Sequence, residues 1–307
     1  MSAVALVISS LVFFNRAPPT TKALAPGAKA NGALAAIPEK SIAVLPFENL
    51  SNEKENAYFA DGVQDEILTG LSRVADLKVI SRTSVMQYKA GPKRNLREVA
   101  TDLGVAHVLE GTVQRADGRV RVNAQLIDAR TDSQLWAERY DRDAADVFGI
   151  ESELAGKIVA QLQAKISPSE KAAIEQKPTN NLEAYDAYLR GLAFEARGGY
   201  SNDALRKAVS SYERAVQFDT NFALGWARLS RADAFLCFHA VETTSGRCDA
   251  AKQALDTAQK LQPNSPETLL ALGWYQCHVL RDYGLAKTTF KEVSKLLPGS
   301  SEVLDAL

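Results

Sequence analysis

One helical pattern occurs three times in the C-terminal part of this chain, and this repetition constrains the fold more than any other feature. The segments 208–221, 251–264 and 286–299 align without gaps as AVSSYERAVQFDTN, AKQALDTAQKLQPN and AKTTFKEVSKLLPG. Each begins with Ala and carries Tyr, Leu or Phe four residues later, with Ala or Val three residues further on. A fixed period of this kind indicates stacked helical units, because each unit buries its apolar face only against its neighbours.

The residues that precede these segments complete the unit. Trp226 and Leu229 keep a Trp-x-x-Leu spacing, and Gly191 and Gly273 stand where two helices of a hairpin must approach closely. Together the two halves match the tetratricopeptide pattern. We therefore predict an all-α tetratricopeptide superhelix over 182–307, with three units and the start of a fourth.

The preceding segment, 41–167, has the pattern of a mixed-sheet α/β domain. Residues 41–47 are strand-prone and end near Pro46, which has no N–H to donate to a neighbouring strand. Apolar residues then recur at helical spacing over 56–74, and 77–81 has the composition of a second strand. A strand, a helix and a strand in this order predict a parallel crossover.

The second half of the α/β segment changes to strict alternation. Apolar residues alternate with polar ones from Val120 to Leu126, and Asp117-Gly118 is a pair that favours tight hairpins. We expect three antiparallel strands here, joined to the parallel pair. A helix over 96–104 with Gly104 as its C-cap precedes them, and a helix over 147–165 closes the domain.

Both ends of the chain are unusual, the N-terminal end in its composition and the C-terminal end in its repeat pattern. Residues 3–14 are apolar and uncharged, but they are shorter than the roughly 20 residues that cross a bilayer. We interpret 1–15 as part of a membrane helix, as an atypical signal or anchor, or as an apolar tail. Residues 16–40 are rich in Ala and Pro and indicate a linker. A fourth helical unit that begins at Ser301 has only seven residues left, so we expect a fragment of a longer protein.

No sequence pattern indicates catalysis, a cofactor or a metal site. The stretch 46–62 contains a single glycine and four acidic residues, which is unsuited to a phosphate loop. The three histidines and three cysteines are too scattered for a metal cluster. A net charge of −1 gives no reason to expect nucleic-acid binding. Whether Cys237 and Cys248 form a disulfide stays open at this point.

Several stretches of the α/β segment resemble a known bacterial family. SIAVLPFENLSN, YFADGVQDEILTGLSRV, LKVISRTSV and IVAQLQAKISPSE, with the alternating segment between the last two, are similar to the TolB-amino-terminal-like (FlgO-like) domain. That domain is commonly followed by tetratricopeptide repeats, beyond a membrane helix. In such proteins the cytoplasmic part is a class III cyclase, a winged-helix domain or a kinase. The resemblance implies a periplasmic, inner-membrane-anchored sensing module without chemistry of its own; a cytoplasmic location is the alternative.

These observations leave two hypotheses for function. In the first, the chain is a non-enzymatic, membrane-tethered module that binds a protein or peptide partner in the groove of the repeats. The candidate groove residues are Tyr185, Tyr188, Arg231, Glu267, Trp274 and His278. Packing between neighbouring hairpins is an equally weighted interpretation of the same side chains. In the second hypothesis, the chain is the regulatory portion of a cyclase or winged-helix regulator whose catalytic or DNA-binding part lies elsewhere.

Overall fold

The computed structural model of this chain describes residues 37–52, 56–89, 95–198, 201–239 and 245–298, with residues 300, 303, 306 and 307. Residues 37–307 form one compact unit. The apolar run 3–14 and nearly all of the expected linker lie outside the described residues. Within the described residues, no helix combines the length and the apolar character that a membrane span requires.

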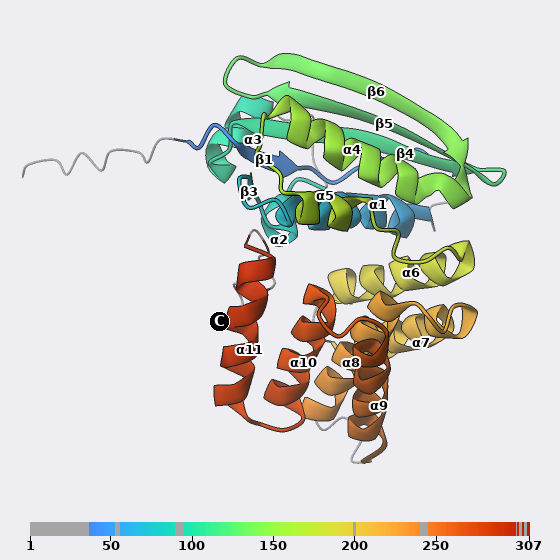
Figure 1. Cartoon of the computed structure of the whole chain (residues 1–307). Coiled ribbons are helices and arrows are strands. Elements are labelled where there is room, and N and C mark those ends of the chain that lie inside the picture. The colour runs from blue at the N-terminus through green and yellow to red at the C-terminus, as the bar shows by residue number, and fades with distance from the viewer. Residues whose placement is uncertain are drawn as a thin grey trace, which may run out of the picture. The chain divides into compact units, whose positions relative to one another are not determined.

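The N-terminal half of this unit is built on a mixed sheet (Figure 1). Its strands are β1 (Ser41–Val44), β2 (Glu48–Asn49), β3 (Lys78–Val79), β4 (His107–Ala116), β5 (Arg119–Asp128) and β6 (Ser133–Asp143). The spatial order is β3-β1-β4-β5-β6, and β2 pairs with β4. β1 is parallel to both β3 and β4, whereas β4, β5 and β6 are antiparallel to one another. The predicted α/β class with a mixed sheet is therefore confirmed.

Two helices cover one face of the sheet and form the main core. The helices of this half are α1 (Ala57–Ser72), α2 (Arg82–Met86), α3 (Leu96–Leu103), η2 (Ala144–Asp146), α4 (Val147–Gln161) and α5 (Pro168–Glu175). Phe59 and Ile67 of α1 and Ile150 of α4 are fully buried in one cluster with Leu109 and Leu126 of the sheet. Burial of such side chains removes apolar area from water and stabilises the layer.

The described residues cover the opposite face of the sheet at its parallel end. Val85 of α2 and Val99 of α3 pack there against Ala43, Leu45 and Val108 of the sheet and its edges. The two short helices thus close the second layer over β1 and β4. On the outer face of β5 and β6 the polar side chains are half-buried or exposed, as the alternation in the sequence predicts.

Two predicted turns are confirmed by backbone geometry. Asp117 and Gly118 have φ angles of 53° and 73°, the left-handed pair that a two-residue hairpin requires between β4 and β5. Gly104 ends α3 with a φ of 64°. Four short elements were not predicted: β2, α2, η2 and α5. They are too short for a periodic apolar pattern to develop.

The C-terminal half contains three helical hairpins. Its helices are α6 (Leu182–Gly198), α7 (Asn202–Phe218), α8 (Ala223–Phe238), α9 (Ser245–Leu261), α10 (Pro266–His278) and α11 (Tyr283–Leu296). α6 packs on α7, α8 on α9 and α10 on α11, and successive hairpins lie side by side (Figure 1). This confirms the predicted all-α region, while its assignment to the tetratricopeptide class stays a prediction.

Glycines set the spacing inside two of the hairpins. A Cβ atom at Gly191 would lie 2.3 Å from the Tyr212 ring, and one at Gly273 would lie 2.3 Å from the Phe290 ring. These contacts are far shorter than van der Waals distance, so only glycine lets the paired helices come this close. The predicted role of both positions in close helix approach is therefore confirmed.

The two helices of the middle hairpin are covalently linked. Cys237 near the end of α8 and Cys248 in the first turn of α9 form a disulfide. This resolves the alternative that the sequence left open. The link joins the two helices at the end where residues 240–244 connect them.

Candidate functional site

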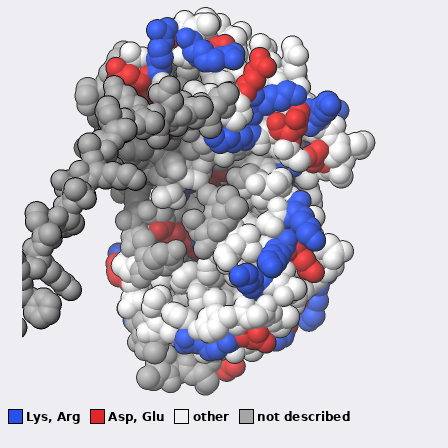
Figure 2. All heavy atoms as spheres, turned by 90° about the vertical axis from the view of Figure 1, so that its left-hand side faces the viewer, with Lys and Arg blue, Asp and Glu red and all other residues white. Residues whose placement is uncertain are grey.

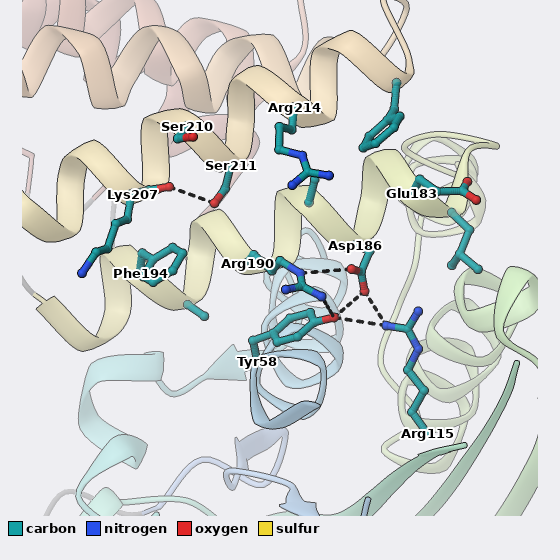
Figure 3. A pocket seen from close by; sticks show the side chains of 14 residues that line it. Tyr58, Arg115, Glu183, Asp186, Arg190, Phe194, Lys207, Ser210, Ser211 and Arg214 are labelled. Atoms are coloured by element: carbon teal, nitrogen blue, oxygen red, sulfur yellow. Dashed lines mark hydrogen bonds and ion pairs between the residues drawn. The ribbon is translucent and has the colours of Figure 1, made fainter. Parts of the chain in front are cut away.

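A cleft of about 680 Å³ lies along the first hairpin (Figure 3). α6 and α7 form its walls, and Tyr58 of α1 and Arg115 of β4 close one end. Its apolar lining consists of Leu182, Ala187, Ala193, Phe194 and Phe218. Its polar lining on the two helices consists of Glu183, Asp186, Arg190, Lys207, Ser210, Ser211 and Arg214. A large, partly apolar cleft with a few convergent charged groups is the usual form of a binding site.

A hydrogen-bonded network around Asp186 organises the closed end of the cleft. The Tyr58 hydroxyl donates to Asp186 Oδ1 at 2.6 Å, and Arg115 forms an ion pair with the same oxygen. Arg190, one turn along α6, reaches Asp186 Oδ2 at 3.1 Å and the Tyr58 hydroxyl at 3.1 Å. Its guanidinium also lies 4.6 Å from the centroid of the Tyr58 ring. Three elements therefore hold one carboxylate in a fixed place.

The protonation states at this end follow from the same contacts. Burial opposes ionisation of Asp186, but the hydrogen bond from Tyr58 and the pairing with Arg115 hold its pKa below the ordinary value. Burial, followed by the neighbouring Asp186 carboxylate, raises the pKa of Tyr58 to about 12. At neutral pH the single Asp186 carboxylate thus pairs with the guanidinium groups of Arg115 and Arg190. The closed end of the cleft therefore keeps an excess of positive charge.

The α7 wall adds two further cations. Lys207 Nζ lies 2.7 Å from Asp203 one turn earlier, on an exposed helix surface where such pairs contribute little. The Arg214 guanidinium lies 5.7 Å from the centroid of the Phe218 ring. Among the described residues Arg214 has no carboxylate within ion-pair distance. Phe218 itself is 43% exposed, which is unusual for so large an apolar side chain.

The structure does not place the predicted groove residues Tyr185 and Tyr188 on an open surface. Both lie on the opposite face of α6 and are at most 2% exposed. Tyr185 donates to Glu151 of α4 at 3.0 Å, and Tyr188 lies 3.4 Å from Glu66 of α1. The expectation that they line an accessible groove is wrong, because α1 and α4 cover this face of the repeats.

Arg231 and Glu267 also face the α/β half of the molecule. They line a cavity of about 50 Å³ together with Thr69 and Ser72 of α1. Glu267 forms an ion pair with Arg73, the residue that caps α1 at its C-terminus. These two side chains thus lie where the groove was predicted, but in this structure α1 of the same chain occupies it.

Trp274 and His278 pack between neighbouring hairpins. Their rings stack at a centroid distance of 5.0 Å, and Phe235 of α8 lies 4.2 Å from the His278 ring. Burial lowers the pKa of His278 to about 4, so the imidazole is neutral at pH 7. The alternative interpretation of packing therefore describes these two residues, and the structure does not bring the six candidates together at one open site.

The junction between the two halves contains a cluster of buried and half-buried polar groups, here called the junction cluster. It consists of Glu66, Glu151, Tyr185, Tyr188 and Arg228. Burial, and then the nearby Asp65 carboxylate, raises the pKa of Glu66 to about 7. Burial and the charge of Glu66 raise the pKa of Glu151 well above its ordinary value. The pKa of both carboxyls is thus raised, in contrast to that of Asp186 in the cleft.

Other surfaces of the molecule give weaker indications. On the face shown in Figure 2, basic side chains of the described residues lie next to acidic ones, so charge does not distinguish one region of that face. Within the described part of the chain, no three His, Cys, Asp or Glu side chains gather closely enough to hold a metal ion. The cleft is therefore the candidate binding site among the surfaces that the structure describes.

Sequence reasoning did not find the cleft, although part of a signal was present. Asp186 and Arg190 are four residues apart on one helix, a spacing that permits an ion pair. Their partners Tyr58 and Arg115 are separated from Asp186 by 128 and 71 residues. Only the packing of α1 and β4 beside α6 brings these four side chains together.

Comparisons with known proteins match parts of this chain. Residues 38–157 match the family model of the HilA/YgeH-like transcriptional regulator, second domain. The chain is also similar to "Putative adenylate cyclase 3" of Rhizobium meliloti (strain 1021), with 41% identity over 194 residues. That match covers 62% of this chain and 32% of the relative, so the chain spans about a third of the relative's length.

Similarity to solved structures is confined to part of the chain. Lipoprotein GNA1162 from Neisseria meningitidis has a TM-score of 0.30 at 20% identity, covering 42% of this chain and 99% of that one. TolB from Acinetobacter baumannii has a TM-score of 0.31 at 17% identity, covering 40% and 28%. The LpoB C-terminal domain from Salmonella enterica has a TM-score of 0.28 at 17% identity, covering 34% and 83%. At these TM-scores the likenesses carry no argument about function.

Proposed function

We propose that this chain is a non-enzymatic docking module that binds a protein partner in the cleft of the first hairpin. The observation that carries the proposal is the cleft itself, with its exposed Phe218 and its preorganised network around Asp186. A fixed network lowers the conformational entropy lost on binding, and an exposed aromatic supplies apolar area to bury.

We further propose that the module is the regulatory portion of a longer signalling protein. The relative whose name includes adenylate cyclase supports this, since the similarity covers only 32% of that protein. The match of residues 38–157 to a domain of a transcriptional regulator supports a role in regulation in the same way. Any nucleotide chemistry would then belong to a different part of the longer protein.

Site-directed photo-crosslinking in cells tests the docking function. A photoreactive amino acid at Ser210, an exposed cleft residue, should give a discrete crosslinked species whose partner mass spectrometry identifies. The same amino acid at Lys291, an exposed residue of α11, is the matched control. Crosslinks that are equal at both positions, or absent at both, would contradict the proposal.

An assay for cyclic AMP formation tests the non-enzymatic part of the proposal. The purified chain, incubated with ATP and Mg²⁺ or Mn²⁺, should form no more product than a buffer blank. A known cyclase at the same concentration serves as the positive control. Turnover by the chain alone would show that it carries its own active site and would overturn this part.

A periplasmic location is part of the same proposal. The Cys237–Cys248 disulfide supports it, because disulfides persist in oxidising compartments and are rare in the cytosol. Trapping free thiols in intact cells with a maleimide that adds mass should leave Cys237 and Cys248 unmodified until a reductant is added. Immediate modification of both would favour the cytoplasmic alternative.

A further inference from the structure

We infer that the partner presents an acidic, amphipathic helix to the cleft, an inference that rests on the docking function proposed above. The cleft is elongated and runs along two packed helices. Its lining extends along α6 from Leu182 to Phe194 and along α7 from Lys207 to Phe218. At 1.5 Å per residue these stretches are about 18 and 16 Å long, which suits a ligand helix of about three turns.

The arrangement of the hairpins favours a helical occupant. Elsewhere in this half, the first helix of each following hairpin packs on the hairpin before it, as α8 does on α7 and α10 on α8. The cleft face of α6 and α7 has no helix of the described chain along it, and α1 and β4 contribute only Tyr58 and Arg115 at one end. A helix laid along the cleft would extend the same helix-on-helix packing.

The charges that line the cleft select an acidic ligand. Four cations, Arg115, Arg190, Lys207 and Arg214, face only two carboxylates. One of these, Asp186, is already bound by Tyr58, Arg115 and Arg190. The Lys207 and Arg190 side chains are 54% and 52% exposed, so both can reach a ligand. Complementary charge steers association and rejects ligands of the wrong sign.

The apolar lining requires that the ligand helix also has an apolar face. Phe194, Phe218 and Leu182 lie on the two walls between the charged groups. A helix with carboxylates on its flanks and Leu or Phe along its centre would bury these rings and pair with the cations. A purely acidic chain would leave the rings in contact with water.

The chain's own N-terminal segment lacks the chemistry of this occupant. Residues 1–36 contain three basic residues, Arg16, Lys22 and Lys29, and no Asp or Glu. A segment of that charge would be repelled by the cations of the cleft. The N-terminal segment is therefore not the inferred ligand.

Fluorescence anisotropy with designed peptides tests the inference. A labelled amphipathic peptide of about twelve residues, long enough to fill the cleft, carries Glu on its flanks and Leu and Phe along its centre. Two controls replace each Glu by Lys or scramble the order while keeping the composition. The acidic amphipathic peptide should bind the full chain at least about tenfold more tightly than either control.

Charge reversal in the protein locates the binding. Arg214→Glu and Lys207→Glu should each weaken binding of the acidic peptide about tenfold. Lys291→Glu makes the same change of charge on α11 and should leave the affinity unchanged. Circular dichroism verifies that all three variants fold, and Arg214→Gln replaces Arg214→Glu if that variant does not.

Two results would overturn the inference. One is equal or tighter binding of the Lys-substituted peptide, and the other is unchanged affinity in both cleft variants. If the crosslink at Ser210 nevertheless identifies a partner, the docking function stands and only the acidic class of ligand is wrong. If neither peptide nor crosslink is found, the docking function itself fails.

Discussion

Each of two faces of α6 takes part in a hydrogen bond between a tyrosine and a carboxyl group, with opposite consequences for the pKa of the carboxyl. On the junction side, the Tyr185 hydroxyl donates to Glu151, and burial raises the pKa of that carboxyl. On the cleft side, the Tyr58 hydroxyl donates to Asp186, and the pKa of that carboxyl is lowered. The same hydrogen bond thus occurs in two electrostatic settings on one helix.

The difference comes from what surrounds each carboxyl. Glu151 is only 7% exposed and faces a second carboxyl, Glu66, so its charged form is disfavoured. Asp186 is partly open to solvent and lies between Arg115 and Arg190, which stabilise its charge. The junction face of α6 is therefore buried against α1 and α4, whereas the cleft face stays accessible to a ligand.

The largest effect on stability is expected from a substitution in the buried interior of the first hairpin. Gly191→Ala would place a Cβ atom 2.3 Å from the Tyr212 ring, which cannot move aside in a packed core. We expect the free energy of unfolding to fall by about 2–3 kcal/mol, measured from urea denaturation.

Gly156→Ala is the matched control for this substitution. Gly156 is exposed on α4, and a Cβ atom there would have no neighbour within 4 Å. Alanine favours a helix interior over glycine, so this variant should gain up to about 1 kcal/mol. If the two substitutions shifted stability in the same direction, close approach at Gly191 would not be the cause.

The second prediction uses pH to separate the two faces. When folding raises the pKa of a carboxyl, the free energy of unfolding falls as the pH rises above the pKa of that carboxyl in the unfolded chain. Ionisation of Glu66 and Glu151 should therefore weaken the fold from pH 4.5 upward. Asp186 has the opposite sign: its contribution is present above pH 3.8 and is lost as pH falls. Burial of His278 acts in the opposite direction below pH 6.5, so the decline is measured from pH 5 to 8 as the difference in urea midpoint between the parent chain and a variant that lacks one of these carboxyls.

Removing one junction carboxyl sharpens this test. Glu66→Gln keeps the size of the side chain and cannot ionise, so the decline should shrink by an amount on the order of 2 kcal/mol. Asp65, Arg73, Arg228 and Glu267 also surround Glu66 and remain in place. Glu183→Gln at the exposed rim of the cleft is the control and should leave the decline unchanged. A parallel decline in all three proteins would assign the pH dependence to other groups.

The third prediction compares the two tyrosine hydroxyls directly, and it includes the smallest expected effect, that of Tyr58→Phe. Tyr185→Phe leaves a buried carboxyl without its donor and should cost about 1–3 kcal/mol of stability. Tyr58→Phe leaves Asp186 with both arginines and should cost less than about 1 kcal/mol. It should weaken peptide binding instead, because the closed end of the cleft is less ordered. Equal stability losses would contradict the distinction between the two faces.

Much of the fold could be predicted from patterns that depend on neighbours in the chain. Alternation from Val120 to Leu126 and the pair Asp117-Gly118 specified the β4–β5 hairpin, since both act over a few residues. Gly191 and Gly273 indicated close helix approach for the same reason. The candidate site could not be predicted in this way, because its four central side chains come from three separate elements.

The groove residues show where such reasoning reaches its limit. Tyr185 and Tyr188 have the helical spacing of an inner face, which was assigned correctly as a face that contacts something. Whether that contact is a partner or another part of the chain depends on how α1 and α4 pack, and no local pattern encodes this. The structure assigns it to the chain itself.

The sequence by itself determined the main elements: the mixed sheet, the three helical hairpins and the glycines between their helices. Local conformational propensity and the spacing of apolar residues act over a few residues, so they can be recognised in the sequence without a structure. Only the tertiary structure decided which face of α6 is buried and which is open. Burial and charge pairing depend on side chains more than a hundred residues apart, as Tyr58 and Asp186 are, and these meet only after the two halves pack together.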